Sequence, residues 1–373
     1  MKFLCLFLIL MFLGGCRSNN DLVINGNTVG INDSKVYLTK FNGRDYQQQD
    51  STYLKNGHFK LEVRKVVYPE QLYISLGDYN IPFISEKGTL NIDVDIDNSK
   101  VKISGTPSND LVDIYRTEDI SLSNKLDSLI ILRDLYIYWN DTLNQQRLNS
   151  EIQRISVHRK TVLEDLIRKN SGNYGAAYIL SESDTYGFSY TQVDSLINLL
   201  SHVLPDNAFS RKLINRRNIL FSVSKWQEMQ DFTLFSPEGE RVNLSSYTGN
   251  YLILDFWAPG YSESERINRN YKSIYGKYHN QGVEIISVYV GRDLDEWRNS
   301  ITENNYNWKH LSQLRGWDSD ILKKYGVIAL PHNVIIDPDG KIIDNLVFGH
   351  DLELLLENEF TKDNNIELPD IVD

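Results

Sequence analysis

The sequence predicts a C-terminal α/β domain, preceded by a small antiparallel β-sandwich and an α-helical connector. Three observations predict this order. Apolar and polar residues alternate between residues 22 and 105, apolar residues then recur at helical spacing, and buried strands alternate with amphipathic helices after residue 231. Together with the N-terminal segment, these patterns predict six parts. They are a signal peptide at 1–15, a tether at 16–21, the β-sandwich at 22–106, the connector at 107–226, the α/β domain at 227–362 and an acidic tail at 363–373.

Residues 1–15 have the pattern of a lipoprotein signal peptide. Lys2 supplies a positive charge, an apolar run follows, and Leu13-Gly14-Gly15-Cys16 resembles the site cut by the lipoprotein signal peptidase. We expect Cys16 to become the first mature residue and to carry lipid, with 16–21 as a tether. This predicts a lipid-anchored protein of the cell envelope, at the outer membrane on its periplasmic side or surface. An ordinary cleaved signal or a helical anchor is the alternative.

Cysteine content and charge exclude several functions. The chain has two cysteines, Cys5 and Cys16, and a formal net charge of −11. Cys5 leaves with the predicted signal peptide and Cys16 holds lipid, so the mature chain has no thiol for redox or metal chemistry. Such an acidic chain lacks the basic surface of a nucleic-acid-binding protein. The sequence shows no zinc-ligand spacing and no phosphate loop, so we expect no metal, cofactor or nucleic acid.

The β-sandwich is predicted from alternating segments separated by turn residues such as Asn42-Gly43 and Lys87-Gly88. The predicted strands are 36–38, 59–63, 71–76 and 90–96. Asp93, Asp95 and Asp97 share one face of the last of these strands. Three carboxylates in a row suggest calcium, but apolar residues fill the other face, so a solvated sheet face is the favoured interpretation.

The connector is predicted to be helical from residue 108 to about residue 226, with breaks at 170–173 and 204–207. Its aromatic residues Tyr136, Tyr138 and Trp139 are expected to pack against neighbouring helices rather than to bind a cofactor.

In the α/β domain, turn residues 236–239 predict a hairpin between strands 232–235 and 241–244. Buried strands follow at 251–257 and 283–290, and a helix from Ser262 to about residue 280 lies between them. Helices are predicted at 294–304, 318–325 and 351–360, with a strand pair at 333–337 and 341–347.

Five segments of the C-terminal domain carry a family resemblance by their order and spacing: 231–239, 244–249, 254–259, 282–288 and 325–341. Through them the domain resembles the TlpA/ResA-type thioredoxin-like lipoproteins and redoxins, over about residues 225–360. This resemblance implies a thioredoxin-like fold, a cis-proline at Pro331, and a dithiol turn after Trp257. In the N-terminal part, the resemblance is carried by Phe59 after Asn56-Gly57, by Pro69-Glu70 and by Ser104-Gly105-Thr106. In these segments the chain resembles the family of domains of unknown function numbered 4369, which precedes such redoxins.

The chain departs from this family at the dithiol itself. The resemblance places a nucleophilic cysteine at 261 and a resolving cysteine at 264, where this chain has Tyr261 and Ser264. Disulfide exchange needs a thiolate, and a phenol with an ordinary pKa near 10 forms no disulfide. We therefore expect no catalytic residue. A hydrolytic Tyr261–Ser264–His332 site is conceivable, but no third member or oxyanion element is identifiable.

The remaining residues of the turn have ordinary structural explanations. Ser262 and Glu265 match a capping box, in which the serine hydroxyl accepts from the amide of Glu265 and the glutamate reaches back.

The family resemblance also implies a place for a partner. Beside the cis-proline, the backbone of active relatives pairs with an extended peptide, a form of β-augmentation. We expect an extended peptide or an envelope protein to bind at the Tyr261/Pro331 surface, and the binding candidates are Trp257, Tyr261, Ser262, Leu330, Pro331 and His332. Simple burial is the alternative explanation for Trp257.

Three functions are therefore open. The first is a redox-inactive, lipid-anchored binding or assembly module. The second is a thiol-disulfide oxidoreductase of the TlpA/ResA type. The third is a structural envelope protein that binds through its N-terminal β domain. The missing cysteines favour the first. The sequence does not identify the partner, the membrane leaflet, the oligomeric state or any residual catalysis.

Overall fold

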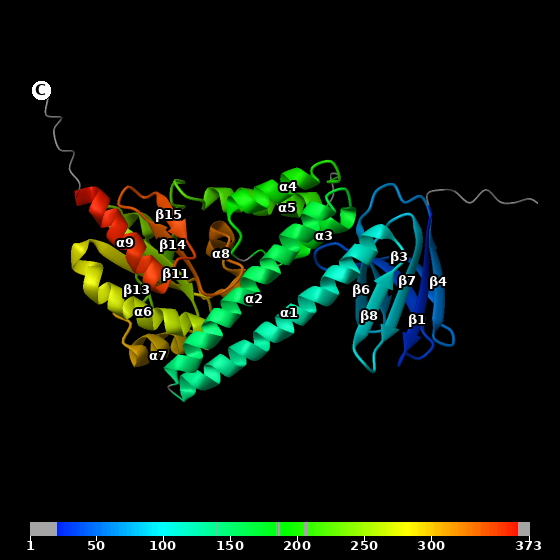
Figure 1. The fold of residues 1–373 in the computed structure, drawn as a ribbon, viewed down its shortest axis with the longest axis horizontal. Helices are drawn as coiled ribbons and strands as arrows, with labels where there is room; N and C mark the ends of the chain where they lie inside the picture. The colour runs from blue at the N-terminus through cyan, green and yellow to red at the C-terminus, as the bar shows by residue number, and fades with distance from the viewer. Residues whose placement is uncertain (1–20, 140, 184, 186, 205–207, 365–373) are drawn as a thin grey trace, which may run out of the picture. The chain divides into compact units, whose positions relative to one another are not determined.

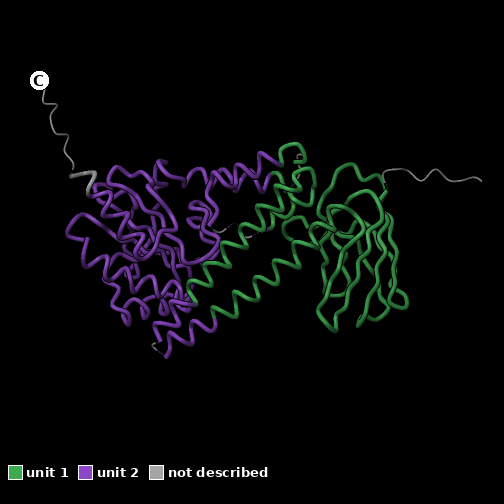
Figure 2. The backbone as a smooth tube through the Cα atoms, in the orientation of Figure 1, with its two compact units in different colours: residues 1–130, 148–182, 200–210 green, residues 131–147, 183–199, 211–373 purple. Residues whose placement is uncertain are grey.

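The computed structural model describes residues 21–139, 141–183, 185, 187–204 and 208–364. The predicted signal peptide, Cys16 and most of the acidic tail lie outside these residues. The chain forms two compact units (Figure 2): unit 1 comprises residues 1–130, 148–182 and 200–210, and unit 2 comprises 131–147, 183–199 and 211–373. The helical connector is thus divided between the units, and the domain boundaries drawn from the sequence stay predictions.

Unit 1 contains the predicted β-sandwich (Figure 1). Its strands are β1 (Leu22–Val29), β2 (Lys35–Phe41), β3 (Tyr46–Tyr53), β4 (His58–Val63), β5 (Gln71–Leu76), β6 (Tyr79–Ile84), β7 (Gly88–Asp95) and β8 (Lys100–Ser104). They form two four-stranded sheets, β4-β1-β7-β8 and β3-β2-β5-β6. Inward-facing apolar side chains of both sheets share one core. The sandwich is therefore confirmed, with one difference: β1 and β7 pair in parallel.

Two of the three carboxylates on the predicted sheet face of Asp93, Asp95 and Asp97 accept hydrogen bonds from asparagine side chains. Asp93 accepts a hydrogen bond from Asn27 at 2.6 Å, and Asp95 accepts one from Asn98 at 2.8 Å. The apolar residues Leu90, Ile92 and Val94 of the same strand point into the core. Among the described residues, no group of three or more histidine, cysteine, aspartate or glutamate side chains could hold a metal ion.

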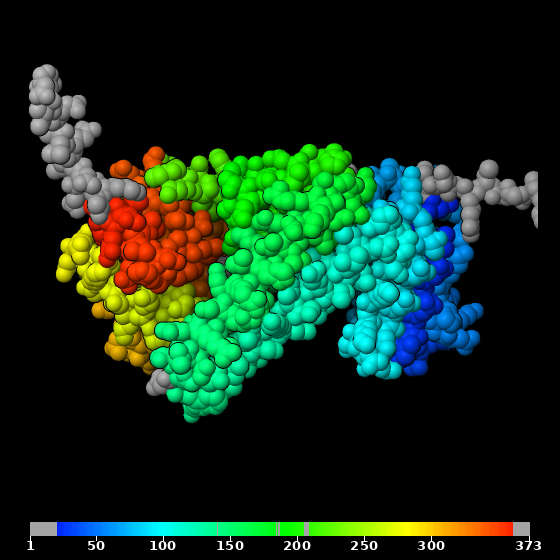
Figure 3. All heavy atoms as spheres, viewed as in Figure 1, coloured from blue at the N-terminus to red at the C-terminus, as the bar shows by residue number. Residues whose placement is uncertain are grey.

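The connector forms α1 (Pro107–Tyr138), α2 (Thr142–Lys169), α3 (Tyr174–Glu182), α4 (Tyr190–Leu200) and α5 (Ala208–Ser222). The expected packing of its aromatic residues is wrong for Tyr138 and Trp139. Tyr138 is 85% exposed, and Trp139 is exposed except for an edge-to-face contact with Tyr136. Tyr138 is the last residue of α1 and Trp139 follows it, so neither has a further turn of α1 to pack against; Figure 3 shows this stretch of the chain between cyan and green. No helix of the described chain is long and apolar enough to cross a membrane.

Unit 2 contains the predicted α/β domain. Its elements are the hairpin β9 (Thr233–Phe235) and β10 (Arg241–Asn243), then β11 (Tyr251–Trp257), α6 (Ser262–Tyr278), β12 (Val283–Tyr289), α7 (Leu294–Asn304), β13 (Lys309–Leu311), α8 (Asp320–Tyr325), β14 (His332–Ile336), β15 (Ile342–Asn345) and α9 (Gly349–Asn364), with short 3₁₀ turns at Leu244–Tyr247, His279–Gln281 and Gly316–Asp318.

The sheet of unit 2 has the order β13-β12-β11-β14-β15. β11, β12 and β13 are parallel, whereas β14 and β15 are antiparallel to their neighbours. The central strand β11 is buried along its whole length because a core lies on each face. Leu252, Leu254 and Phe256 point into one core, and Ile253 and Trp257 point into the other, beneath α6. This arrangement places the end of β11 and the first turn of α6 next to each other.

Candidate functional site

The turn between β11 and α6 is built by one glycine and one glutamate. Gly260 has a positive φ of 76°, a conformation that glycine adopts without steric cost. Its amide donates to Oε1 of Glu265 at 3.0 Å, and the amide of Glu265 donates to the carbonyl of Tyr261 at 3.1 Å. Glu265 therefore fixes the chain on entry to the helix, and its negative charge suits the helix N-terminus.

The capping box was predicted with the wrong partner atoms. Tyr261, not Ser262, is the residue that precedes the helix, and it makes no side-chain cap. Glu265 does reach back, but to Gly260. The hydroxyl of Ser262 instead donates to Oδ2 of Asp134 at 3.1 Å. Asp134 belongs to the C-terminal turns of α1, and no spacing in the sequence links it to residue 262.

The two positions of the expected dithiol lie in opposite environments. Tyr261 is 43% exposed, whereas Ser264 is 1% exposed. The Ser264 hydroxyl finds no hydrogen-bond partner in the described part of the chain. A serine needs an adjacent base to become a nucleophile. The structure therefore gives no support to the conceivable Tyr261–Ser264–His332 hydrolytic site.

The proline loop has the predicted conformation, since the Leu330–Pro331 peptide bond is cis. Pro331 and His332 are buried, Leu330 is half-buried, and Ile328 at the start of the loop is exposed. Burial lowers the pKa of His332 to about 4, with the charge of Arg216 acting in the same direction. His332 is therefore a neutral core residue that packs its ring against Phe256, not a surface contact for a partner.

Trp257 is also buried, with none of its surface exposed. The burial interpretation is confirmed, and its place in a surface patch was wrong. Its ring packs edge-on against Tyr306 at 5.7 Å between centroids. Of the six binding candidates, only Tyr261, Ser262 and Leu330 offer surface, and the hydroxyl of Ser262 is already used by Asp134.

A buried carboxyl beneath α6 was missed by the sequence analysis. Asp255 lies in β11 and is 1% exposed. Burial raises its pKa to about 7, although hydrogen bonds from Ser287 and Tyr271 favour the charged form. Ser287 donates to Asp255 at 2.9 Å and itself accepts from the indole of Trp308 at 2.9 Å. An aspartate within the apolar run Leu252–Phe256 was the signal that could have revealed it.

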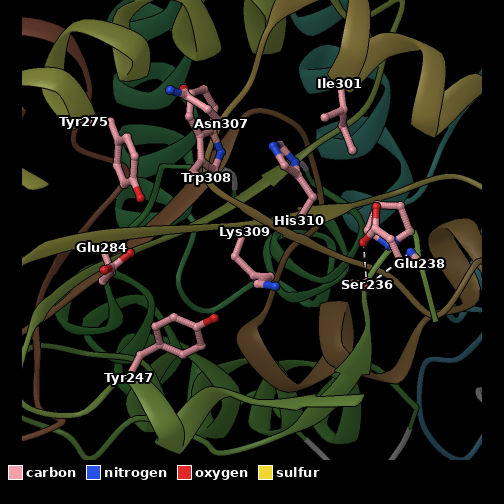
Figure 4. A pocket seen from close by; sticks show the side chains of 11 residues that line it. Ser236, Glu238, Tyr247, Tyr275, Glu284, Ile301, Asn307, Trp308, Lys309 and His310 are labelled. Atoms are coloured by element: carbon pink, nitrogen blue, oxygen red, sulfur yellow. Dashed lines mark hydrogen bonds between the residues drawn. The ribbon is translucent and has the colours of Figure 1, made fainter. Parts of the chain in front are cut away.

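A cleft of about 460 Å³ lies elsewhere on unit 2 (Figure 4). Its walls are the β9–β10 turn, α6, α7 and the strand that begins at Lys309, and aromatic rings of Tyr247, Tyr275 and Trp308 line it. Lys309 forms an ion pair with Glu240 at 3.4 Å. No residue of the turn 257–265 lines the cleft, so it is separate from the expected dithiol site.

Comparison with known proteins gives the family. A family model described as thioredoxin-like matches residues 249–342, and the model of a domain of unknown function, DUF4369, matches residues 22–112. The thiol-disulfide oxidoreductase ResA of Bacillus thuringiensis subsp. konkukian is 30% identical over 120 residues, covering 32% of this chain and 68% of that protein. The chain belongs to the thioredoxin-like thiol-disulfide oxidoreductase family.

Other relatives and solved structures are also similar to parts of this chain. ResA of Bacillus subtilis is 27% identical over 122 residues, which cover 33% of this chain and 66% of that protein. The thioredoxin domain of a thiol-disulfide oxidoreductase from Bacteroides vulgatus is 25% identical, with a TM-score of 0.35 and coverage of 37% of this chain and 99% of that chain. A thiol-disulfide oxidoreductase from Bacteroides fragilis is 24% identical, with a TM-score of 0.34 and coverage of 36% and 99%.

Proposed function

We propose that this chain is a redox-inactive member of its family that works as a lipid-anchored binding or assembly module of the cell envelope. One observation carries the proposal: the two positions expected to hold the dithiol are Tyr261 and Ser264. A disulfide forms and breaks only through sulfur atoms, so neither side chain can replace a cysteine. The printed names of the relatives describe thiol-disulfide oxidoreductases, and that activity is the alternative proposal for this chain.

The exposure of Tyr261 supports a binding role for the turn between β11 and α6. Tyr261 is a large amphipathic side chain at the surface, of the type that anchors protein partners. Leu330 is half-buried on the proline loop, and Ile328 beside it is exposed. An extended segment of an envelope protein that pairs with the backbone near residue 329 would bring its side chains to these residues.

The lipid anchor is a separate part of the proposal. It rests on Leu13-Gly14-Gly15-Cys16 and on the apolar run before it. If Cys16 carries lipid, the wild-type chain is recovered with membranes, and the variant Cys16→Ser is recovered in the soluble or uncleaved form. Equal membrane recovery of a cleaved Cys16→Ser chain would contradict lipid anchoring.

The partner surface is tested by photocrosslinking in cells of the source organism. A benzoylphenylalanine at position 261 is expected to capture a discrete protein, because the aromatic ring there faces solvent. Tyr79 of β6 is the matched control, since it is an equally exposed tyrosine in the β-sandwich. Capture from position 79 but not from 261 would reject the site proposed here and favour binding through the N-terminal β domain.

A further inference from the structure

The turn between α1 and α2 contacts the first turn of α6, next to the positions where the dithiol is expected, and both segments belong to unit 2. We call residues 131–139 and 141–147 the hairpin tip; the structure groups them with unit 2 (Figure 2). The tip is ordered by its own bonds: the carboxylate of Asp141 accepts from the amide of Asn144 at 3.1 Å and from its side chain at 2.6 Å. Gln145 also donates to the carbonyl of Tyr136 at 3.1 Å. These bonds hold the described residues of the tip in a defined conformation, in which the tip can contact another part of the chain.

A buried guanidinium joins the tip to the first turn of α6. Arg133 is 6% exposed, although arginine is a residue type that is rarely buried without partners. Its Nη1 donates to Oε2 of Glu263 at 2.8 Å, and its Nε and Nη2 donate to Oδ1 of Asp134 at 3.1 and 2.9 Å. Asp134 in turn accepts from Ser262 at 3.1 Å. Arg133 therefore sits between one carboxylate of its own helix and one of α6.

This arrangement differs from an ordinary surface ion pair. An exposed pair is screened by water and contributes little, but a charge removed from water needs its partners in place. Without the first turn of α6, Arg133 would keep only Asp134 and would lose both its second carboxylate and its cover. The contact is therefore specific: the first turn of α6 is the surface that supplies the second carboxylate to the buried guanidinium of the tip.

The residues that receive the tip are the two between positions 261 and 264. Ser262 and Glu263 occupy the middle of the segment in which relatives of this family are expected to carry the dithiol. We propose that the hairpin tip is the resident occupant of this turn. The tip holds the N-terminal turn of α6 through Arg133 and Asp134, and Gly260 and Tyr261 of the same turn remain exposed. This inference does not depend on the absence of redox activity.

The contact is tested by a disulfide between engineered cysteines. In a full chain with Cys5 and Cys16 replaced by serine, the pair Asp134→Cys and Ser262→Cys is expected to oxidise within one chain, because these two side chains touch. The control pair is Asp134→Cys with Arg269→Cys, since residue 269 is exposed about two turns further along α6. Peptide mapping identifies the bond. Equal oxidation rates for the two pairs would overturn the proposal.

Hydrogen exchange gives a second measurement without cysteines. The variant Arg133→Gln is expected to speed exchange at the amides of residues 265 and 266 by about tenfold or more, because it removes the bond between the tip and Glu263 and leaves the Arg266–Glu263 pair within α6 in place. The control is Arg154→Gln, which breaks an exposed pair on α2 and is expected to leave these amides unchanged. Unchanged exchange in folded Arg133→Gln would contradict the proposal, and the cysteine pair decides if that variant fails to fold.

Discussion

The buried carboxyl of Asp255 allows a quantitative prediction. The change is Asp255→Asn, which keeps the shape of the side chain and removes its charge. In the folded chain burial raises the pKa of Asp255 to about 7, whereas the ordinary value is 3.8. At ~1.4 kcal/mol for each pKa unit, this difference corresponds to about 4 kcal/mol of stability.

The sign follows from the direction of the pKa change. Because the folded pKa is raised, the contribution of Asp255 is fully present below the unfolded pKa and is lost as the pH rises to about 7. The asparagine side chain does not ionise, so the variant does not lose this stability as the pH rises. We therefore expect the free energy of unfolding of the variant, relative to that of the wild type, to rise by up to about 4 kcal/mol between about pH 4 and about pH 8. A constant difference between the two proteins at acid pH does not alter this change.

The assay is denaturant unfolding followed by tryptophan fluorescence. The six tryptophans are Trp139, Trp226, Trp257, Trp297, Trp308 and Trp317, and all belong to unit 2. The signal therefore reports the unit that contains Asp255. Subtracting wild-type from variant free energies at each pH removes the contributions of the other titrating groups. A difference that stays constant from about pH 4 to about pH 8 would refute the reasoning, since it would mean that Asp255 ionises as easily folded as unfolded.

Three further substitutions test other parts of the account. Ser264→Ala should raise the stability of unit 2 by about 1 kcal/mol in the same assay, since it removes a buried hydroxyl without a partner in the described chain; a loss above about 1 kcal/mol would contradict this. In His332→Phe, the stability lost between about pH 6.5 and about pH 4 should be smaller than in the wild type by about 3 kcal/mol. The reason is that burial lowers the pKa of His332 to about 4, so its stabilisation is lost as the pH falls. Gly26→Ala should destabilise the β-sandwich by about 1–3 kcal/mol, because its new Cβ would lie 1.9 Å from the Phe59 ring; hydrogen exchange in β1 measures this, and unchanged protection would refute it.

The sequence predicted the elements whose hydrophobic pattern is strong. β11, α6 and β12 follow the expected ranges closely because a strand buried on both faces and an amphipathic helix each leave a clear period. The cis bond before Pro331 came from resemblance to a family, since most X–Pro bonds are trans. Strand β3 was missed because all its residues are polar or aromatic and none is buried, as is common for an edge strand.

The contacts of the site were much less predictable. Residues 133 and 263 are far apart in the sequence, and a polar helix surface does not reveal which arginine will be buried. Ser262 could equally have capped its own helix or bonded another segment, and only the fold brings Asp134 within reach. Trp257 and His332 illustrate the same limit, because proximity to a turn in sequence does not tell a core side chain from an accessible one.

The proposed absence of redox activity is tested most directly by reduction of insulin disulfides with dithiothreitol. The purified full-length chain is compared with a no-protein control and with a thiol-disulfide oxidoreductase as positive control. We expect the chain to reduce insulin no faster than the no-protein control, because positions 261 and 264 carry tyrosine and serine. A rate above that control, kept in a chain with Cys5 and Cys16 replaced by serine, would contradict the central claim.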